Sequence, residues 1–224
     1  MTLPLESDDR SRQTDAVRWL VAILLITGAY ATMRYNVFEN VPWRHWPLYV
    51  LNKIVCWSGL LLLARSYTEN RFRRLRDRER GRQSARRKFF GLAGFSLVTM
   101  HVLMSLLLMS SAYYPKFYDG PKMNLIGELS LLAGVLSLGC FVVPMVTTLP
   151  GMHESLGADR WRRTQRIGYL GLAGASVHLL VMGGAGWLTP SRWAGYMPPI
   201  TLLAFLAAVL PLLLRKLKPA PGTA

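Results

Sequence analysis

Residues 86–111 read RRKFFGLAGFSLVTMHVLMSLLLMSS, an apolar run that opens with Arg86 and Arg87 and carries His101 near its middle. The run is long enough to form a helix that crosses the hydrocarbon core of a bilayer. An imidazole at that depth has no water to bond, so its ring nitrogens need partners from the protein or from a ligand. The stretch therefore predicts a membrane fold with a polar site inside it.

A second apolar run repeats this pattern. Residues 166–184, RIGYLGLAGASVHLLVMGG, carry His178. His101 lies 12 residues beyond Phe89, and His178 lies 11 residues beyond Ile167. At about 1.5 Å per residue, the two rings are expected at nearly the same depth. Two imidazoles placed in this way could hold a flat ligand between them.

Glycines precede both histidines at the same two spacings, 10 and 7 positions earlier. They are Gly91 and Gly94 before His101, and Gly168 and Gly171 before His178. Steps of 7 and 10 return to nearly the same face of a helix, so a strip without side chains is expected beside each imidazole. We interpret the four glycines as cofactor-binding residues that leave room for a porphyrin.

Six apolar runs of roughly 18 to 22 residues recur along the chain of 224 residues, separated by short polar segments. This pattern predicts an all-α, polytopic membrane protein, a six-helix transmembrane bundle. The expected spans are residues 16–35, 48–64, 86–111, 125–147, 166–184 and 198–214. Residues 1–15 are expected to be a disordered cytoplasmic tail, residues 16–214 the transmembrane domain, and residues 215–224 a short cytoplasmic tail.

The chain has a net charge of +15, and its Lys and Arg residues are concentrated in alternate polar segments. Of the 27 Lys and Arg residues, 21 lie in the segments at one end of the expected bundle, five at the other, and Lys53 in a helix. By the positive-inside rule both termini are expected to be cytoplasmic, in a multi-pass protein of a bacterial cytoplasmic (inner) membrane. Such loops serve topology and bind anionic lipid, so membrane lipid is the expected partner and nucleic acid is not.

Other polar residues carry weaker signals. The basic loop at residues 65–88 is expected to form a short helix on the membrane surface, interrupted by Gly81. Lys53 either extends to the outer surface or pairs with Glu128, which lies at a similar depth. His45 and His153 are expected to be solvated loop residues.

Haem is the leading candidate ligand for His101 and His178, which would be its two metal ligands. Neutral imidazole is a good axial ligand for haem iron, and two of them fill both axial positions. In the alternative, each imidazole only bonds a helix carbonyl or a serine, such as Ser105 or Ser176. Zinc needs about four ligands, which these apolar surroundings do not supply.

Two motifs also carry a family resemblance. They are Arg86-Arg87, Gly91 and His101 in one expected helix, and Leu156-Gly157, Trp161, Arg166, Tyr169 and His178 leading into another. In these the chain resembles the ferric-reductase-like transmembrane domain, and within that family it is most similar to the haem-binding membrane subunit of the bacterial periplasmic methionine-sulfoxide reductase system. The likeness covers the third to fifth expected helices.

The resemblance implies a b-type cytochrome in which His101 and His178 hold one haem b. It also implies a quinol or flavin electron donor and a separate partner, such as a periplasmic reductase. One position departs from the family pattern, because Gln165 stands where the family has a further histidine. An amide cannot replace imidazole as a strong ligand of haem iron, so a second haem is not expected.

The function expected from the sequence is electron transfer by a subunit of an oxidoreductase system that has no catalytic domain of its own. Quinone is a second candidate ligand, expected at the outer end near Lys53, Glu128 and the aromatic loop. Arg86, Arg87 and Arg166 are candidates for contact with haem propionates. The alternative function is a membrane anchor or assembly subunit of a larger complex, which keeps the fold without transferring electrons.

Overall fold

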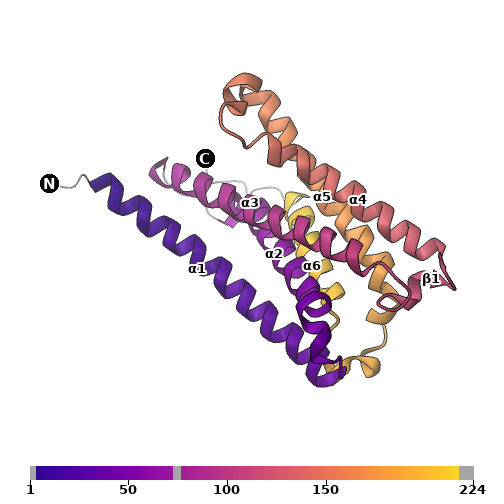
Figure 1. The fold of residues 1–224 in the computed structure, drawn as a ribbon. Coiled ribbons are helices and arrows are strands. Elements are labelled where there is room, and N and C mark those ends of the chain that lie inside the picture. Colours follow the sequence, from indigo (N-terminus) through magenta and orange to yellow (C-terminus); the bar gives the residue numbers. More distant parts are fainter. Residues whose placement is uncertain (1–3, 73–76, 217–224) are drawn as a thin grey trace.

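The computed structural model describes the backbone of residues 4–72 and 77–216, and the side chains of residues 14–69 and 85–216. Within these ranges, six helices are long and apolar enough to cross a membrane. They are α1 (Pro4–Thr32), α2 (Leu51–Phe72), α3 (Asp77–Leu108), α4 (Leu125–Val146), α5 (Met152–Trp187) and α6 (Ile200–Lys216) (Figure 1). The prediction of an all-α bundle with six spans is confirmed, whereas the cytoplasmic placement of the termini stays a prediction.

Short elements join these helices. α1 continues as a π-helix, Met33–Phe38, and α2 is preceded by a 3-10 turn, Trp43–His45, and a π-helix, Trp46–Val50. Between α3 and α4, strands β1 (Tyr118–Asp119) and β2 (Lys122–Met123) form a small antiparallel hairpin. α4 then begins at Asn124, whose side chain accepts a hydrogen bond from the backbone of Gly127 at 3.0 Å.

The two ends of the bundle differ in composition. At the basic end, where Arg65, Arg86 and Arg166 lie, Arg86 forms an ion pair of 3.0 Å with Asp15 and ties α3 to α1. At the aromatic end, where the elements between α1 and α2 lie, the Tyr30 hydroxyl donates to the carbonyl of Pro198 at 2.7 Å. The two ends of the bundle are named the basic end and the aromatic end after these residues.

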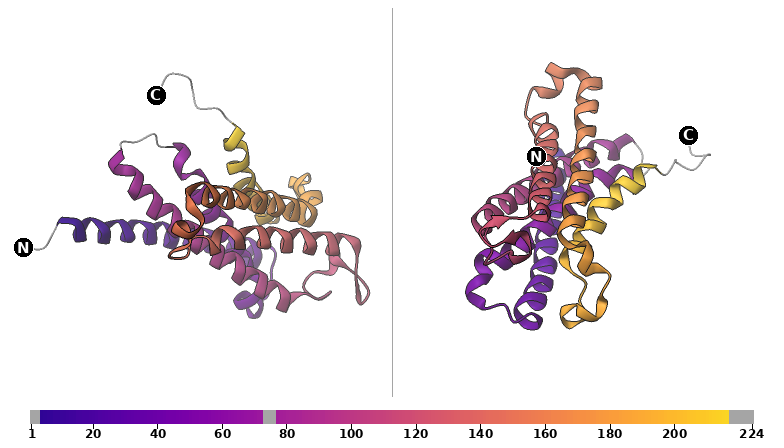
Figure 2. Two further views of the ribbon diagram at one scale, coloured as in Figure 1. Left: turned by 90° about the horizontal axis from the view of Figure 1, so that it is seen from above. Right: turned by 90° about the vertical axis from the view of Figure 1, so that its right-hand side faces the viewer.

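α2 is the central helix. In its most apolar stretch 61% of the residues are buried inside the protein, whereas the other five spans have 17–33%. It packs on α1, α3 and α6, while α5 packs on α4 and α6. Figure 1 shows α1 and α4 at opposite flanks of the bundle, and Figure 2 shows α4 and α5 lying side by side.

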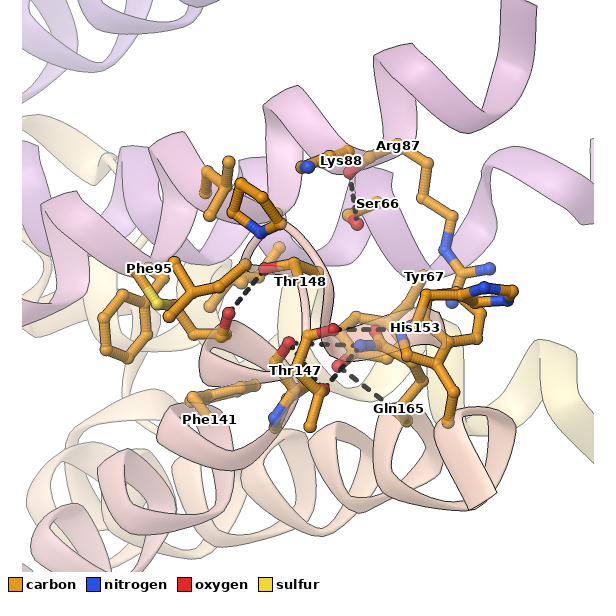
Figure 3. Close-up of a pocket in the computed structure, with 18 of the residues that line it drawn as sticks. Ser66, Tyr67, Arg87, Lys88, Phe95, Phe141, Thr147, Thr148, His153 and Gln165 are labelled. Atoms are coloured by element: carbon orange, nitrogen blue, oxygen red, sulfur yellow. Dashed lines mark hydrogen bonds between the residues drawn. The ribbon is translucent and has the colours of Figure 1, made fainter. Parts of the chain in front are cut away.

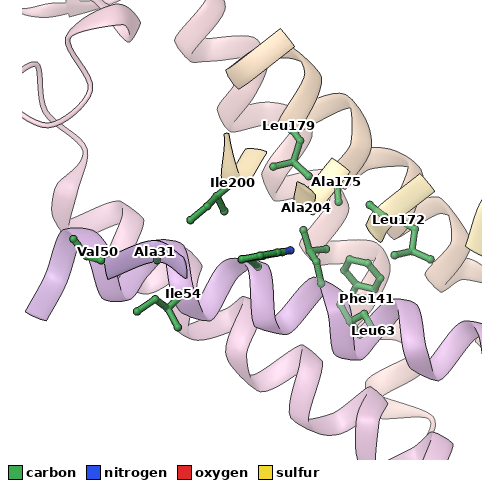
Figure 4. Packing of buried hydrophobic residues seen from close by; sticks show 13 residues of the cluster. Ala31, Val50, Ile54, Leu63, Phe141, Leu172, Ala175, Leu179, Ile200 and Ala204 are labelled. Atoms are coloured by element: carbon green, nitrogen blue, oxygen red, sulfur yellow. The ribbon is translucent and has the colours of Figure 1, made fainter. Parts of the chain in front are cut away.

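The core of the bundle lies between α2, α5 and α6 (Figure 4). Its buried members include Ile54 and Leu63 of α2, Leu172 and Leu179 of α5, and Ala204 of α6. Lipid tails are as apolar as these side chains, so burial in a bilayer gains little from the hydrophobic effect and stability comes from close packing. Small residues at the contacts are therefore as important as large ones.

Two helix pairs make the closest contacts. Gly59 of α2 and Gly94 of α3 lie so near each other that a Cβ on Gly94 would be 2.9 Å from the Gly59 carbonyl oxygen. On the other side, Ser137 of α4 donates to the carbonyl of Gly171 of α5 at 2.7 Å. α3 and α4 touch each other little. The α2–α3 and α4–α5 pairs thus face each other across a loosely packed seam.

Three expectations for the polar segments differ from the structure. α1 begins at Pro4, so a helix replaces most of the tail expected at residues 1–15. Extending an existing helix adds one hydrogen bond per residue, and no proline or glycine follows Pro4 before the apolar run. Gly81 lies inside α3 and does not interrupt it, and α5 begins at Met152, with Gly157 (φ 71°) breaking its regular geometry. Residues 217–224 of the expected C-terminal tail lie outside the described residues.

Candidate functional site

His178 is held by a backbone carbonyl of the neighbouring helix. Its Nδ1 lies 2.7 Å from the carbonyl oxygen of Ser130 on α4 and 3.2 Å from the Ser130 hydroxyl. A carbonyl oxygen only accepts, so Nδ1 of His178 carries the hydrogen. In a neutral imidazole the other nitrogen, Nε2, then has a free lone pair.

His101 is held by an amide side chain. Its Nδ1 lies 2.7 Å from Oδ1 of Asn52 on α2, and Nδ2 of Asn52 donates to the Ser105 hydroxyl at 3.0 Å. Because the amide nitrogen is used by Ser105, the amide oxygen faces the imidazole and accepts its Nδ1 hydrogen. His101 therefore adopts the same tautomer as His178, with Nε2 free.

Both rings line one cavity, which we call the two-histidine cavity. It lies between the α2–α3 and α4–α5 pairs and is bordered mostly by apolar side chains, among them Val98, Leu106, Leu138, Phe141 and Met182. Within the part of the chain that the structure describes, no protein group hydrogen-bonds Nε2 of either histidine. The structure thus brings together the two histidines that the sequence singled out, with one unused ligand atom on each.

The size of this cavity limits what it admits without rearrangement. Its volume is about 100 Å³, whereas cavities for cofactor-sized ligands measure roughly 300–1,000 Å³. Two neutral imidazoles with free Nε2 atoms have the chemistry to hold a metal ion, but a macrocycle would require side chains that border the cavity to move. Flexible residues such as Leu106, Met109 and Met182 lie there, and little contact between α3 and α4 opposes the movement.

A second cavity, of about 270 Å³, lies at the basic end between the same helix pairs (Figure 3). We call it the polar cavity, because its border includes the polar residues Tyr67, Arg87, His153 and Gln165. Phe141 borders both cavities.

Gln165 borders the polar cavity. Its Nε2 donates to the carbonyl of Pro144 at 3.1 Å and to the hydroxyl of Thr147 at 3.0 Å (Figure 3). Trp161 donates to the carbonyl of Thr147 at 3.0 Å. These bonds tie the first half of α5 to the C-terminal end of α4.

The four predicted glycines do not form open strips. A Cβ on Gly168 would lie 1.5 Å from the Tyr67 hydroxyl, and one on Gly171 would lie 2.8 Å from the Phe141 ring. Gly94 packs on α2, and Gly91 borders the polar cavity, 3.2 Å from the Ser66 hydroxyl by the same measure. Neighbouring side chains occupy this space, so a role beside a bound ligand stays a prediction.

Other predicted residues lie elsewhere. No ion pair joins Lys53 to Glu128 among the described residues, and Glu128 is exposed. Arg86 is paired with Asp15, Arg87 borders the polar cavity, and Arg166 is exposed.

The remaining two histidines contact aromatic rings. The ring of His45 packs edge-on to Tyr113 at the aromatic end, with ring centroids 5.7 Å apart, and that of His153 packs edge-on to Trp161 at the basic end, 5.2 Å apart. Neither borders the two-histidine cavity. Within the described residues, no group of three or more His, Cys, Asp and Glu side chains is placed to hold a metal ion.

Sequence reasoning missed the residues that orient the imidazoles. Asn52 is completely buried, and its position inside an apolar run was the available signal. Ser130 and Gly134 lie one helical turn apart on α4, and a Cβ on Gly134 would be 3.1 Å from Nδ1 of His178. For His178 the acceptor is the backbone carbonyl of Ser130, which no side chain in the sequence could have revealed.

Lys116 lies where the two-histidine cavity approaches the aromatic end. It donates to the carbonyl of Met182, and its Nζ is 5.0 Å from the centroid of the Phe117 ring. Both partners border the cavity. Burial lowers the pKa of Lys116, and the positive charge of Lys53 lowers it further.

No protein-family model matches the sequence, and no curated protein matches it either.

Proposed function

We propose that this protein is a membrane-embedded b-type cytochrome in which His101 and His178 hold one haem b. The single observation that carries the proposal is the matched state of these histidines. Each donates its Nδ1 hydrogen to a buried acceptor, and both border one cavity with Nε2 unused. Histidines that bind metals almost always donate their other ring hydrogen in this way, which fixes the tautomer and makes the ligand nitrogen more basic.

The resemblance to the ferric-reductase-like transmembrane domain supports the same proposal, because its motif histidines are these two residues. His101 and His178 would hold the haem, which would supply one-electron transfer at this site. The residues around the two histidines would have two tasks. Asn52 and the Ser130 carbonyl orient the ligands, and the apolar side chains of the cavity exclude water.

The proposed donor is a quinol or a flavin, and the proposed acceptor is a separate redox protein, such as a periplasmic reductase. The polar cavity supports donor entry at the basic end, because it shares the Phe141 side chain with the border of the two-histidine cavity. A ligand there would meet hydrogen-bonding groups at Tyr67 and Gln165 and apolar side chains deeper in the bundle. With the basic end facing the cytoplasm of a bacterial inner membrane, electrons would cross from there toward the aromatic end.

An absorbance spectrum of the purified protein tests the proposal. The wild type is expected to show a reducible b-type spectrum, which disappears in His101→Ala and in His178→Ala because each variant removes one axial ligand. The chain offers two matched controls, His45→Ala and His153→Ala. Both remove a histidine outside the two-histidine cavity and are expected to keep the spectrum.

A stable protein that stays colourless after expression with excess haem would contradict the proposal. That result would favour the alternative function, a membrane anchor or assembly subunit of a larger complex. Loss of the spectrum in His153→Ala, with retention in His178→Ala, would also contradict the assignment of the ligands.

A further inference from the structure

Lys53 is a cation inside a membrane span, and its side chain contacts two tyrosines. Its Nζ lies 4.9 Å from the ring centroids of both Tyr49 and Tyr114, and 3.5 Å from the Tyr114 hydroxyl. An unpaired lysine inside a bilayer is energetically costly. Cation–π contacts with two rings offset part of that cost, and more so where water is excluded. The protein thus keeps a partly buried positive charge in this span. Among the described residues no carboxylate forms an ion pair with it, and Glu39 is the carboxylate that interacts with it electrostatically at longer range.

Hydrogen bonds connect this charge to His101. The Tyr114 hydroxyl lies 3.4 Å from Nδ2 of Asn52, and Oδ1 of Asn52 accepts from the imidazole at 2.7 Å. Asn52 is fully buried, and Tyr114 borders the two-histidine cavity with only 8% of its surface exposed. The chain Lys53–Tyr114–Asn52–His101 therefore runs through the interior, where solvent screens charge weakly.

The two imidazoles differ in this respect. His178 bonds a backbone carbonyl and the hydroxyl of the same residue, Ser130. Among the described residues, no charged side chain hydrogen-bonds Ser130. The cation is thus linked to one ligand, His101.

We propose that Asn52 is a positioning residue for His101, and that Lys53 is a fixed cation which makes the bound haem easier to reduce. The inference rests on the proposed function, since it concerns the same site. Reduction of the ferric haem adds one electron and lowers the charge of the centre by one, with no other bond made or broken. A positive charge held nearby in a medium of low dielectric constant favours that reduced state.

Redox titration of the purified haem-loaded protein, followed by absorbance, tests the role of Lys53. Lys53→Met and Lys53→Gln are expected to shift the one-electron equilibrium about tenfold toward the ferric form, which corresponds to about 59 mV. Lys53→Arg keeps the cation and is expected to keep the wild-type potential. Lys122→Met is the matched control, because it removes a lysine that is exposed on β2.

The role of Asn52 has a separate readout, the affinity for added haem. Asn52→Leu removes the acceptor of the His101 hydrogen and is expected to weaken haem binding about 10- to 100-fold, as loss of outer-shell partners does in other metal sites. Asn36→Leu is the matched control, because it removes a buried amide that donates to the carbonyl of Val41 and does not border the two-histidine cavity.

The outcomes separate this inference from the function on which it rests. A colourless wild type overturns both. A coloured wild type whose potential is the same in Lys53→Met and Lys53→Gln overturns the role of Lys53 alone, and full haem affinity in Asn52→Leu overturns the role of Asn52. If Lys53→Met does not assemble, Lys53→Gln, which keeps a polar side chain of similar length, decides the question.

Discussion

Gly134 of α4 lies directly against the imidazole of His178 on α5: a Cβ at this glycine would be 3.1 Å from Nδ1 and 3.4 Å from Cε1 of the ring. The same imidazole donates to Ser130, one turn earlier on α4. Because Gly134 has no side chain, the imidazole can occupy this position, and the hydrogen bond to the Ser130 carbonyl fixes its orientation. α4 shapes the site although it contributes no ligand.

Enlarging Gly134 is expected to disturb the site without disturbing the bundle elsewhere. Gly134→Val should displace the His178 ring and lower haem retention at least tenfold, because its hydrogen bond to Ser130 and the position of Nε2 cannot both be kept. Haem content per protein after purification measures the effect. Gly139→Val is the matched control on the same helix, since no atom lies within 4 Å of a Cβ there. Equal haem content in the two variants would contradict this account.

Gly168 receives the Tyr67 side chain, so it is expected to be a packing residue. A Cβ on Gly168 would be 1.5 Å from the Tyr67 hydroxyl, and Gly168→Ala should destabilise the protein by about 1–3 kcal/mol through overpacking. Thermal unfolding in detergent measures the loss. In Gly168→Ala/Tyr67→Ala the clash is gone, so the double variant should be more stable than the two separate costs predict.

Gly186→Ala serves as the control for this pair, because nothing lies within 4 Å of a Cβ at that position. Additive costs in the double variant would show that the two residues do not contact each other.

Gln165 is expected to join helices and not to affect the number of haems. Gln165→Leu removes donors to the Pro144 carbonyl and the Thr147 hydroxyl, which should cost about 1–2 kcal/mol of stability. The haem-to-protein ratio, measured by absorbance of the extracted haem, should be one in the wild type and in the variant. A ratio of two in the wild type would place a second haem in this protein and contradict the reading of Gln165.

Lys53 and Glu128 are expected to act independently. They form no ion pair, and Glu128 is exposed while Lys53 lies between two tyrosine rings. In a double-mutant cycle with Lys53→Met and Glu128→Gln, the effects on thermal stability should add within about 0.5 kcal/mol. A larger coupling would restore the pairing that the sequence suggested.

The sequence by itself determined the six spans and the two histidines that face one cavity. A bilayer requires long uninterrupted apolar helices, and imidazoles at equal depth can be counted along them. The helix ends in the polar segments could not be located from the sequence. A helix can propagate past an apolar run by local cooperativity, which composition does not reveal.

Only the tertiary structure decided what surrounds those histidines. Whether a glycine leaves open space or receives a neighbouring ring, as Gly171 receives Phe141, depends on which face of each helix meets its neighbour. Asn52 reaches His101, and the Ser130 carbonyl reaches His178, because α2 packs on α3 and α4 packs on α5. Helix rotation and contact are properties of pairs of helices, and the periodicity of one helix does not contain them.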